Sequence, residues 1–273
     1  MEIKFFKHLI LCLLTVSSLG ACLRDDPVEG GDTPESDYTV YKMGTPTSYS
    51  TSEYKLEGLS AICLNEAGDG LLVANDNGFV HEFGFDGKLK NTFSFPSPND
   101  ARDWEGISRS VDGSTIYMSE ERTREVYTLN ANHAGVTLIS NGPRESESTD
   151  NQGYEGIAAG NGVLYISNQS KPLRVYRYTL ETKTWDTAFN ASWDAKSLSD
   201  IFYDAEDGTL WITDAKTLLL SHLKTDGTVL HHYDISSFNK NFKPEGFCKD
   251  TERKVFWFVC DATSNIYKVS YQR

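Results

Sequence analysis

The sequence predicts an all-β protein built as a five-bladed β-propeller, with four antiparallel strands per blade and the last blade closed by the N-terminal strand. One short phrase, an acidic residue usually followed by glycine and an apolar residue, occurs five times. Its acids lie 45 to 50 residues apart and are Glu57, Glu105, Glu155, Asp200 and Glu245. This period is typical of a propeller blade, whereas a helical solenoid would show an apolar period of 3.6 residues.

The first repeat contains four strand-like segments separated by turn signals. These segments are Leu59–Leu64, Leu71–Ala74, Val80–Phe85 and Leu89–Phe95. The Gly-rich stretch at 68–70 separates the first two, and Asp86-Gly87, a hairpin signal, separates the last two. The later repeats follow the same plan, so each is expected to form one four-stranded blade.

The fifth repeat ends one strand early. Its third strand is expected at Asn265–Ser270, and the sequence ends at Arg273. The segment Tyr38–Met43 precedes the first repeat and has no blade of its own. We therefore expect it to pair with the strand around 266–270 and close the ring, which leaves fewer unprotected sheet edges.

The N-terminal region predicts export and anchoring. Residues 1–21 combine a basic start, a short apolar run and small residues, as a signal peptide does. Cys22 follows Leu-Gly-Ala, which resembles a bacterial lipobox and predicts an acyl anchor in a membrane; an ordinary signal peptide that contains a cysteine is the alternative. The polar segment 22–37 is expected to be a flexible tether to the propeller at 38–273. Asp25-Asp26 resembles a surface-export signal, so an outer-membrane lipoprotein, periplasmic or surface-exposed, is expected.

The net charge limits the kinds of partner expected for this protein, and the cysteine pattern indicates the state of its thiols. The formal net charge is −13, and loss of residues 1–21, with one acid and two lysines, makes the remainder one unit more negative. This balance argues against nucleic acid as a partner and favours cations or basic ligands. The three cysteines of the propeller region lie in apolar strand patterns and are expected to be buried thiols: Cys63, Cys248 and Cys260. We expect a monomer.

Oxygen-bearing side chains are expected to gather at one end of the propeller channel. The first strand of each blade lines the channel and the second runs antiparallel to it, so the start of one and the end of the other share a face. The repeated acids stand at the first position. At the second stand Asn75, Glu120, Asn168, Asp214 and Asp261, with Asp76 and Glu121 beside the first two. A hard cation needs six to eight oxygens, so calcium is the cofactor that this arrangement predicts.

Two alternatives stay open at these positions. The acids could accept backbone N–H bonds at the entry of each inner strand and hold neighbouring blades in register, while glycine permits close approach at the crowded centre. The asparagines could be turn formers. Trp104 and Tyr154 precede two of the acids and could edge the channel mouth as ligand contacts or belong to the core between blades.

The repeats resemble the SdiA-regulated, YjiK-like propeller family. The resemblance covers residues 38–273 and rests on the phrases Leu56-Glu57-Gly58-Leu59-Ser60, Trp104-Glu105-Gly106-Ile107, Tyr154-Glu155-Gly156-Ile157 and Pro244-Glu245-Gly246-Phe247. It implies a β-propeller, with calcium-linked roles for some members and no settled reaction. Asp200 departs from the pattern because no glycine follows it.

Three functions are compatible with this sequence. The first is a binding module whose channel mouth holds a cation and recognises a small ligand or a partner protein on the same face. The second is a calcium-dependent hydrolase of lactone or phosphate esters, similar to lactonases and phytases. The third is a purely structural interaction domain. The first is favoured over an enzyme, because the basic residues that a phosphate would need are scattered and no serine-hydrolase elbow occurs.

Overall fold

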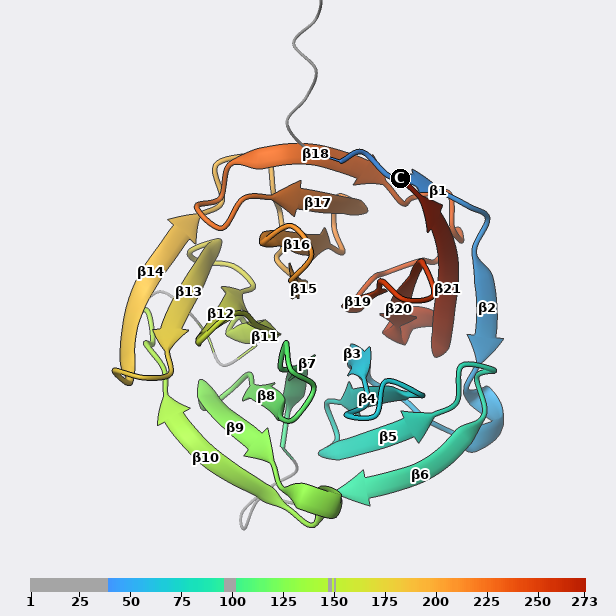
Figure 1. Cartoon of the computed structure of the whole chain (residues 1–273), viewed down its shortest axis with the longest axis horizontal. Helices are drawn as coiled ribbons and strands as arrows, with labels where there is room; N and C mark the ends of the chain where they lie inside the picture. The colour runs from blue at the N-terminus through green and yellow to red at the C-terminus, as the bar shows by residue number, and fades with distance from the viewer. Residues whose placement is uncertain (1–38, 96–101, 147–148, 150) are drawn as a thin grey trace, which may run out of the picture. The chain divides into compact units, whose positions relative to one another are not determined.

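Five antiparallel sheets are arranged as blades around a central axis in the computed structural model (Figure 1). The structure describes residues 39–95, 102–146, 149 and 151–273. The expected signal peptide at 1–21, Cys22 and the tether at 22–37 lie outside the described residues and stay predictions. The five-bladed, all-β fold predicted from the repeat period is confirmed.

The first four blades are meanders of four consecutive strands that run outward from the axis. Blade 1 contains β3 (Leu59–Leu64), β4 (Leu71–Asn75), β5 (Phe79–Phe83) and β6 (Leu89–Ser94). Blade 2 contains β7 (Trp104–Arg109), β8 (Ile116–Glu120), β9 (Glu125–Leu129) and β10 (Val136–Asn141). Blade 3 contains β11 (Tyr154–Ala159), β12 (Val163–Asn168), β13 (Arg174–Thr179) and β14 (Thr184–Asn190). Blade 4 contains β15 (Asp200–Asp204), β16 (Thr209–Asp214), β17 (Leu219–Leu223) and β18 (Val229–Asp234).

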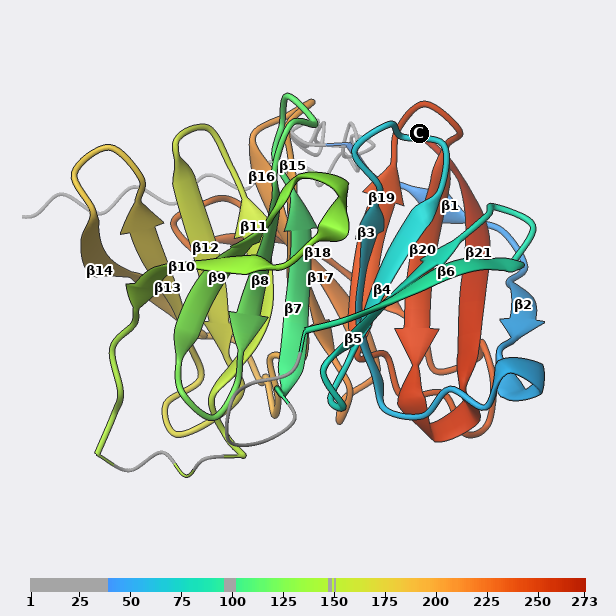
Figure 2. The same cartoon turned by 90° about the horizontal axis from the view of Figure 1, so that it is seen from below.

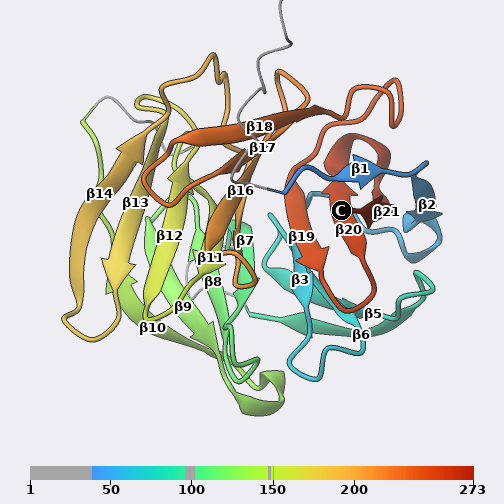
Figure 3. The same cartoon turned by 45° about the horizontal axis from the view of Figure 1, so that its top comes forward.

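The last blade combines both ends of the propeller. It contains β19 (Gly246–Asp250), β20 (Val255–Cys260), β21 (Asn265–Gln272) and, on its outer side, β1 (Lys42–Met43) and β2 (Thr47–Ser50). Figure 3 shows β1 and β2 beside β21. The described residues also include three single-turn 3₁₀ segments, which are Ser52–Tyr54, Ala131–His133 and Asp261–Thr263.

Closure by the N-terminal strand is confirmed, but the residues differ from the expectation. The outer strand beside 265–268 is β2, at 47–50, rather than Tyr38–Met43. Lys42 and Met43 pair instead with Gln272 and Tyr271, beyond the expected partner segment. The reason is the length of β21, whose eight residues accommodate two short strands in succession. Between them the Gly44 N–H donates to the Ser270 carbonyl at 2.8 Å.

Apolar side chains fill the spaces between neighbouring blades. One cluster joins blades 4 and 5 and includes Trp211, Phe247 and Phe256, all at most 2% exposed. Burial of such large aromatic surfaces is the main source of stability for an antiparallel propeller. Cys63, Cys248 and Cys260 are buried free thiols, as expected. Among the described residues, no helix has the length and apolarity needed to cross a bilayer.

Candidate functional site

The inner strands are in register around the axis. One residue of each pairs with the equivalent residue of its second strand, and these five form a middle layer: Ile62, Ile107, Ile157, Ile201 and Phe247. Two residues earlier lies the mouth layer, composed of Ser60, Glu105, Glu155, Ser199 and Glu245. Two residues later lies the far layer, composed of Leu64, Arg109, Ala159, Tyr203 and Lys249. Figure 2 views the ring edge-on, with its strands running between the two faces.

This register corrects two of the five expected positions. Glu57 lies three residues before Ser60, is exposed, and is outside the inner strand. Asp200 lies one residue after Ser199, where the other repeats have glycine or alanine. Blades 1, 2 and 3 share the same one-residue β-bulge, so the cause is the position of the phrase itself. Glu57 lies five residues before Ile62 and Asp200 one residue before Ile201, whereas the other three acids lie two residues before the middle layer. Three glutamates and two serines therefore share the mouth layer.

Asp200 holds two blades together. Its side chain is 1% exposed, and its two oxygens accept the N–H groups of Ile201 at 2.8 Å and of Phe247, in the next blade, at 2.6 Å. Burial raises the pKa of Asp200, and these two N–H donors oppose that rise. Because both oxygens are engaged, Asp200 has the register-holding role that was the alternative to a metal ligand.

Two further carboxylates cross blade junctions. The Gly58 N–H donates to Asp261 Oδ1 at 2.8 Å, between blades 1 and 5. The Gly153 N–H donates to Glu121 Oε1 at 3.2 Å, between blades 3 and 2. Gly58 has φ +64°, and a Cβ there would lie 1.8 Å from Asp76 Oδ1, so this turn requires glycine. The glycine of the repeated phrase therefore serves close packing, as the register alternative states.

Glu105 and Glu155 differ from these clamps, because the charged groups beside them are mainly other carboxylates. Glu105 shares a hydrogen bond with Asp103, and Glu155 shares one with Glu121. One carboxylate oxygen from each of Asp103, Glu105 and Glu121 lies within 4.8 Å of the others. This spacing permits three carboxylates to bind one cation, which would replace the missing countercharge.

The protonation of these acids reflects their crowding. Burial raises the pKa of Glu105 well above its ordinary value, and the charges of Asp103, Glu121 and Glu245 raise it further. Burial likewise raises the pKa of Glu155, with Glu105 the largest charged contributor. The pKa of Glu121 rises to about 7, again through burial first. A cation at this point would reverse these shifts, because it favours the ionised form of every neighbouring carboxyl.

Glu245 and Asp103 are partly compensated. Burial raises the pKa of Glu245, while Lys243, 3.4 Å from Glu245 Oε1, lowers it. Burial raises the pKa of Asp103, while Arg122, 3.2 Å from Asp103 Oδ2, lowers it. The edge of the acidic mouth thus carries two basic partners, while Glu105 and Glu155 lie deeper.

The expected second ring mostly orders turns. The Asn75 and Asp214 side-chain oxygens accept backbone N–H groups of their own loops, from Phe79 at 2.9 Å and Lys216 at 2.9 Å. The Asn168 amide donates to the Pro172 carbonyl at 2.7 Å. Glu120 Oε2 accepts the Thr123 N–H at 2.6 Å. Asp261 lies at a blade junction, and these residues shape the mouth. An oxygen of each of Asn75, Glu120, Asp214 and Asp261 already accepts a backbone N–H group.

Trp104 and Tyr154 belong to the core rather than to the edge of the mouth. Both are 0% exposed. The Trp104 ring packs edge-on against Tyr127 at 5.3 Å, and the Tyr154 hydroxyl donates to the Pro143 carbonyl at 3.1 Å. Each begins an inner strand and pairs with the last residue of the second strand, which turns its side chain into the blade. The expectation that they contact a ligand is thereby corrected.

The repeat pattern did not single out Asp103. It precedes Glu105 by two residues and has no counterpart in the other repeats, so a search for five-fold equivalence passes over it. Two features of the sequence could have indicated Asp103. One is its spacing of two residues from Glu105, and the other is the Glu120-Glu121 pair at the end of the second strand, which lies beside the start of the first strand.

Fold and site together define a five-bladed propeller with one acidic channel mouth. The chain belongs to the SdiA-regulated family, whose sequence profile matches residues 51–260. Two solved structures share the architecture. A glutaminyl cyclase from Myxococcus xanthus has a TM-score of 0.64 at 9% identity, with 85% of this chain and 96% of that chain covered. A protein of unknown function from Bacteroides thetaiotaomicron has a TM-score of 0.57 at 13% identity, with 83% and 72% covered. Among curated proteins, no match was found.

Proposed function

We propose that this protein is an exported, lipid-anchored propeller that binds a calcium-type cation at its acidic mouth and recognises a small ligand or a partner protein on the same face. The observation that carries the proposal is the grouping of Asp103, Glu105 and Glu121, whose ligand atoms lie within 4.8 Å of one another. Glu155 and Glu245 extend this group around the mouth layer.

The electrostatics of the mouth support a bound cation. Burial raises the pKa values of Glu105 and Glu155, and the charges of Glu121 and Glu245 raise both further, so at neutral pH the metal-free mouth either keeps protons or carries repelling charges. One bound divalent ion would remove both the need for these protons and the repulsion between the carboxylates. Asp103, Glu105 and Glu121 all belong to blade 2, while Glu155 and Glu245 come from blades 3 and 5. Calcium accepts such irregular oxygen sets, whereas magnesium demands an octahedron.

Calorimetry and thermal unfolding test the proposal. Calcium should bind the chelator-treated protein and raise its melting temperature, because a ligand specific to the folded state stabilises it by about 2.7 kcal/mol at a hundredfold excess over Kd. Glu105→Gln should weaken calcium binding, and the exposed Glu252→Gln, at the opposite end of an inner strand, is the matched control. A wild-type protein that neither binds calcium nor gains stability from it contradicts the proposal.

Hydrolysis of lactone or phosphate esters is the competing function. The basic side chains beside the acids are paired, Arg122 with Asp103 and Lys243 with Glu245, which disfavours a phosphate site. Assays of the calcium-loaded protein on lactone and phosphoester substrates decide between the two functions. Turnover that requires calcium and is lost in Glu105→Gln would establish the enzyme. Absence of turnover together with absence of calcium binding would favour a purely structural interaction domain.

Anchoring at Cys22 is a separate part of the proposal. Cys22→Ser should move the protein from the membrane fraction to the soluble fraction and abolish labelling by a fatty-acid analogue. Unchanged labelling contradicts the lipobox interpretation. If Asp25-Asp26 direct surface display, replacement of both by alanine should remove protease accessibility on whole cells without changing the total amount.

A further inference from the structure

A cavity of about 310 Å³ lies at the end of the axis opposite the acidic mouth. All ten residues of the middle and far layers line it, whereas the mouth layer does not contribute. Every blade therefore supplies part of its wall. Its volume is at the lower end of the roughly 300–1,000 Å³ found for small-molecule pockets.

The deeper wall of this cavity is apolar. It is formed by the middle layer of four isoleucines and Phe247, of which Ile62, Ile107 and Phe247 are at most 2% exposed. These side chains separate the cavity from the carboxylates of the mouth layer. An apolar ligand group placed here would lose contact with water, which is the usual driving force for binding in a concave site.

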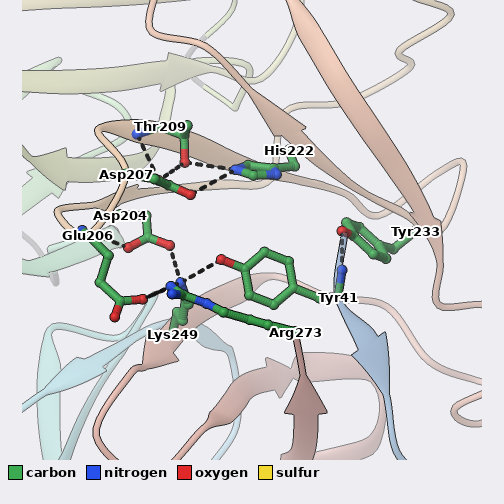
Figure 4. Close-up of polar contacts among 9 residues, drawn as sticks. All are labelled: Tyr41, Asp204, Glu206, Asp207, Thr209, His222, Tyr233, Lys249 and Arg273. Atoms are coloured by element: carbon green, nitrogen blue, oxygen red, sulfur yellow. Dashed lines mark hydrogen bonds and ion pairs between the residues drawn. The ribbon is translucent and has the colours of Figure 1, made fainter. Parts of the chain in front are cut away.

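The two cations of the far layer differ in their partners. Lys249 is fully buried and forms ion pairs with Asp204 and with Glu206, the latter at 3.2 Å. Figure 4 shows its ammonium group between these carboxylates and the Tyr41 hydroxyl, 3.1 Å away. Lys249 is therefore saturated by the protein. Asp250, a further acid of the wall, pairs with Arg253 at 3.1 Å.

Arg109 occupies the position equivalent to Lys249 but has no carboxylate partner among the residues that the structure describes. Its Nη2 donates to the Glu66 carbonyl at 2.8 Å. Its Nε is buried and makes no hydrogen bond. A Cβ at Gly113 would lie 2.1 Å from Nη2, so the guanidinium is held closely against this turn. It is a fixed cation with unused donor capacity at the rim of an apolar cavity.

We propose that this far cavity is a second binding site, for a small organic carboxylate with an apolar body. The carboxylate would accept hydrogen bonds from Arg109, whose planar group suits carboxylate geometry, and the apolar body would lie against the middle layer. In the wall, Lys249 pairs with Asp204 and Glu206, and Arg253 pairs with Asp250 and Glu252. Arg109 is therefore the one base of the described wall that has no carboxylate partner. The inference is independent of cation binding at the acidic mouth.

Isothermal titration calorimetry with the full chain tests this inference, using octanoate, 1-octanol and inorganic phosphate as probes. Octanoate should bind more tightly than 1-octanol, and phosphate should not compete, because it lacks the apolar part. Arg109→Gln should weaken octanoate binding about tenfold or more, the effect of losing one charge-assisted contact. Arg109→Lys should restore part of it. Arg177→Gln is the control, since that guanidinium lies outside the cavity and pairs with Asp186 at 2.6 Å.

Three outcomes would overturn the inference. They are the absence of octanoate binding, equal affinity for octanoate and 1-octanol, and unchanged affinity in a folded Arg109→Gln protein. The melting temperature of each variant without ligand checks the fold, and Arg109→Lys supplies the comparison if Arg109→Gln unfolds. Octanoate binding should be the same with calcium or chelator and in Glu105→Gln, which separates this site from the proposed function of the acidic mouth.

Discussion

The two ends of the channel both contain buried carboxylates but compensate them differently. At the far end, the buried acid Asp204 has a buried base, Lys249, as its partner. At the acidic mouth, Glu105 and Glu155 lie against other carboxylates, and their pKa values rise well above the ordinary range. The first arrangement is complete within the protein. The second becomes complete only with protons or an added cation.

This difference shows which end depends on solution conditions. The far end carries ion pairs whose charges persist across neutral pH: burial opposes the charged form of Lys249, but Asp204 and Tyr41 outweigh it and hold its pKa above the ordinary value. The mouth carries Glu121, whose pKa rises to about 7. We therefore expect substitutions at the far end to lower the free energy of unfolding. Changes of pH or calcium concentration should instead act on stability through the mouth.

The largest effect is expected from breaking the far pair. Lys249→Met leaves Asp204, whose side chain is 2% exposed, as a buried charge without its partner. Removal of one member of a buried ion pair costs about 3–5 kcal/mol. Urea unfolding followed by circular dichroism should show this loss in the free energy of unfolding.

A double variant controls for packing. Lys249→Met combined with Asp204→Leu removes both charges and should recover most of the stability, because the cost comes from the orphaned carboxylate. A double variant as unstable as Lys249→Met would mean that shape, not charge, holds this end together.

The next effect is the pH dependence of the metal-free protein. The folded state holds a proton on Glu121 between its ordinary pKa of 4.5 and about 7, while the unfolded state does not. Stability should therefore fall as pH rises through this window, by on the order of 3 kcal/mol from Glu121. Thermal unfolding from pH 5 to 8 with chelator measures this fall, and calcium should suppress it.

Two buried histidines change stability with pH in the opposite direction, so their contribution must be separated from that of Glu121. Burial lowers the pKa values of His81 and His222 to about 4, so each removes stability as pH falls below about 6.5. The difference between curves with and without calcium isolates the mouth, because both histidines lie outside the mouth layer. Glu155→Gln should also stabilise the metal-free protein at pH 8. If it destabilises that protein, the mouth is not under electrostatic strain.

A smaller effect tests how the N-terminal segment supports the far end. The Tyr41 hydroxyl accepts a hydrogen bond from Lys249 Nζ at 3.1 Å, and its ring packs edge-on against Trp211 at 5.2 Å. Tyr41→Phe keeps the ring and removes the hydroxyl, so it should cost about 1–2 kcal/mol. Chemical unfolding measures it, and Tyr233→Phe, which removes the acceptor of the Tyr41 N–H, is the companion variant. If Tyr41→Phe leaves the free energy of unfolding unchanged, the carboxylates beside Lys249 suffice to stabilise it.

The sequence predicts the blades because strand alternation and turn residues are local properties. Gly68-Asp69-Gly70 and Asp86-Gly87 mark real turns, and the strands of blade 1 end within two residues of their expected bounds. The period between repeats sets the number of blades in the same way. These features need no knowledge of distant contacts.

The composition of the mouth depends on register, which is a long-range property. The repeated acid lies five residues before the middle layer in blade 1, two before it in blades 2, 3 and 5, and one before it in blade 4, so the phrase alone does not fix the layer that the acid occupies. Asp103 and Ser199 became visible as neighbours of the site only when the pairing with the second strands was known. The proposed carboxylate site in the far cavity likewise rests on Arg109 having no carboxylate partner among the described residues, which no local pattern encodes.

The smallest effect is expected at Glu57, where sequence and structure disagree most. Glu57 carries the first copy of the repeated phrase, but it is exposed, and Ser60 takes its place in the mouth layer. Glu57→Gln should therefore change the free energy of unfolding by less than about 0.5 kcal/mol, as surface substitutions do. Calcium titration should show an affinity within about threefold of wild type, against a much larger loss in Glu105→Gln. Equal losses in the two variants would mean that the repeated phrase, not the strand register, defines the cation site, and that Glu57 moves inward when the cation binds.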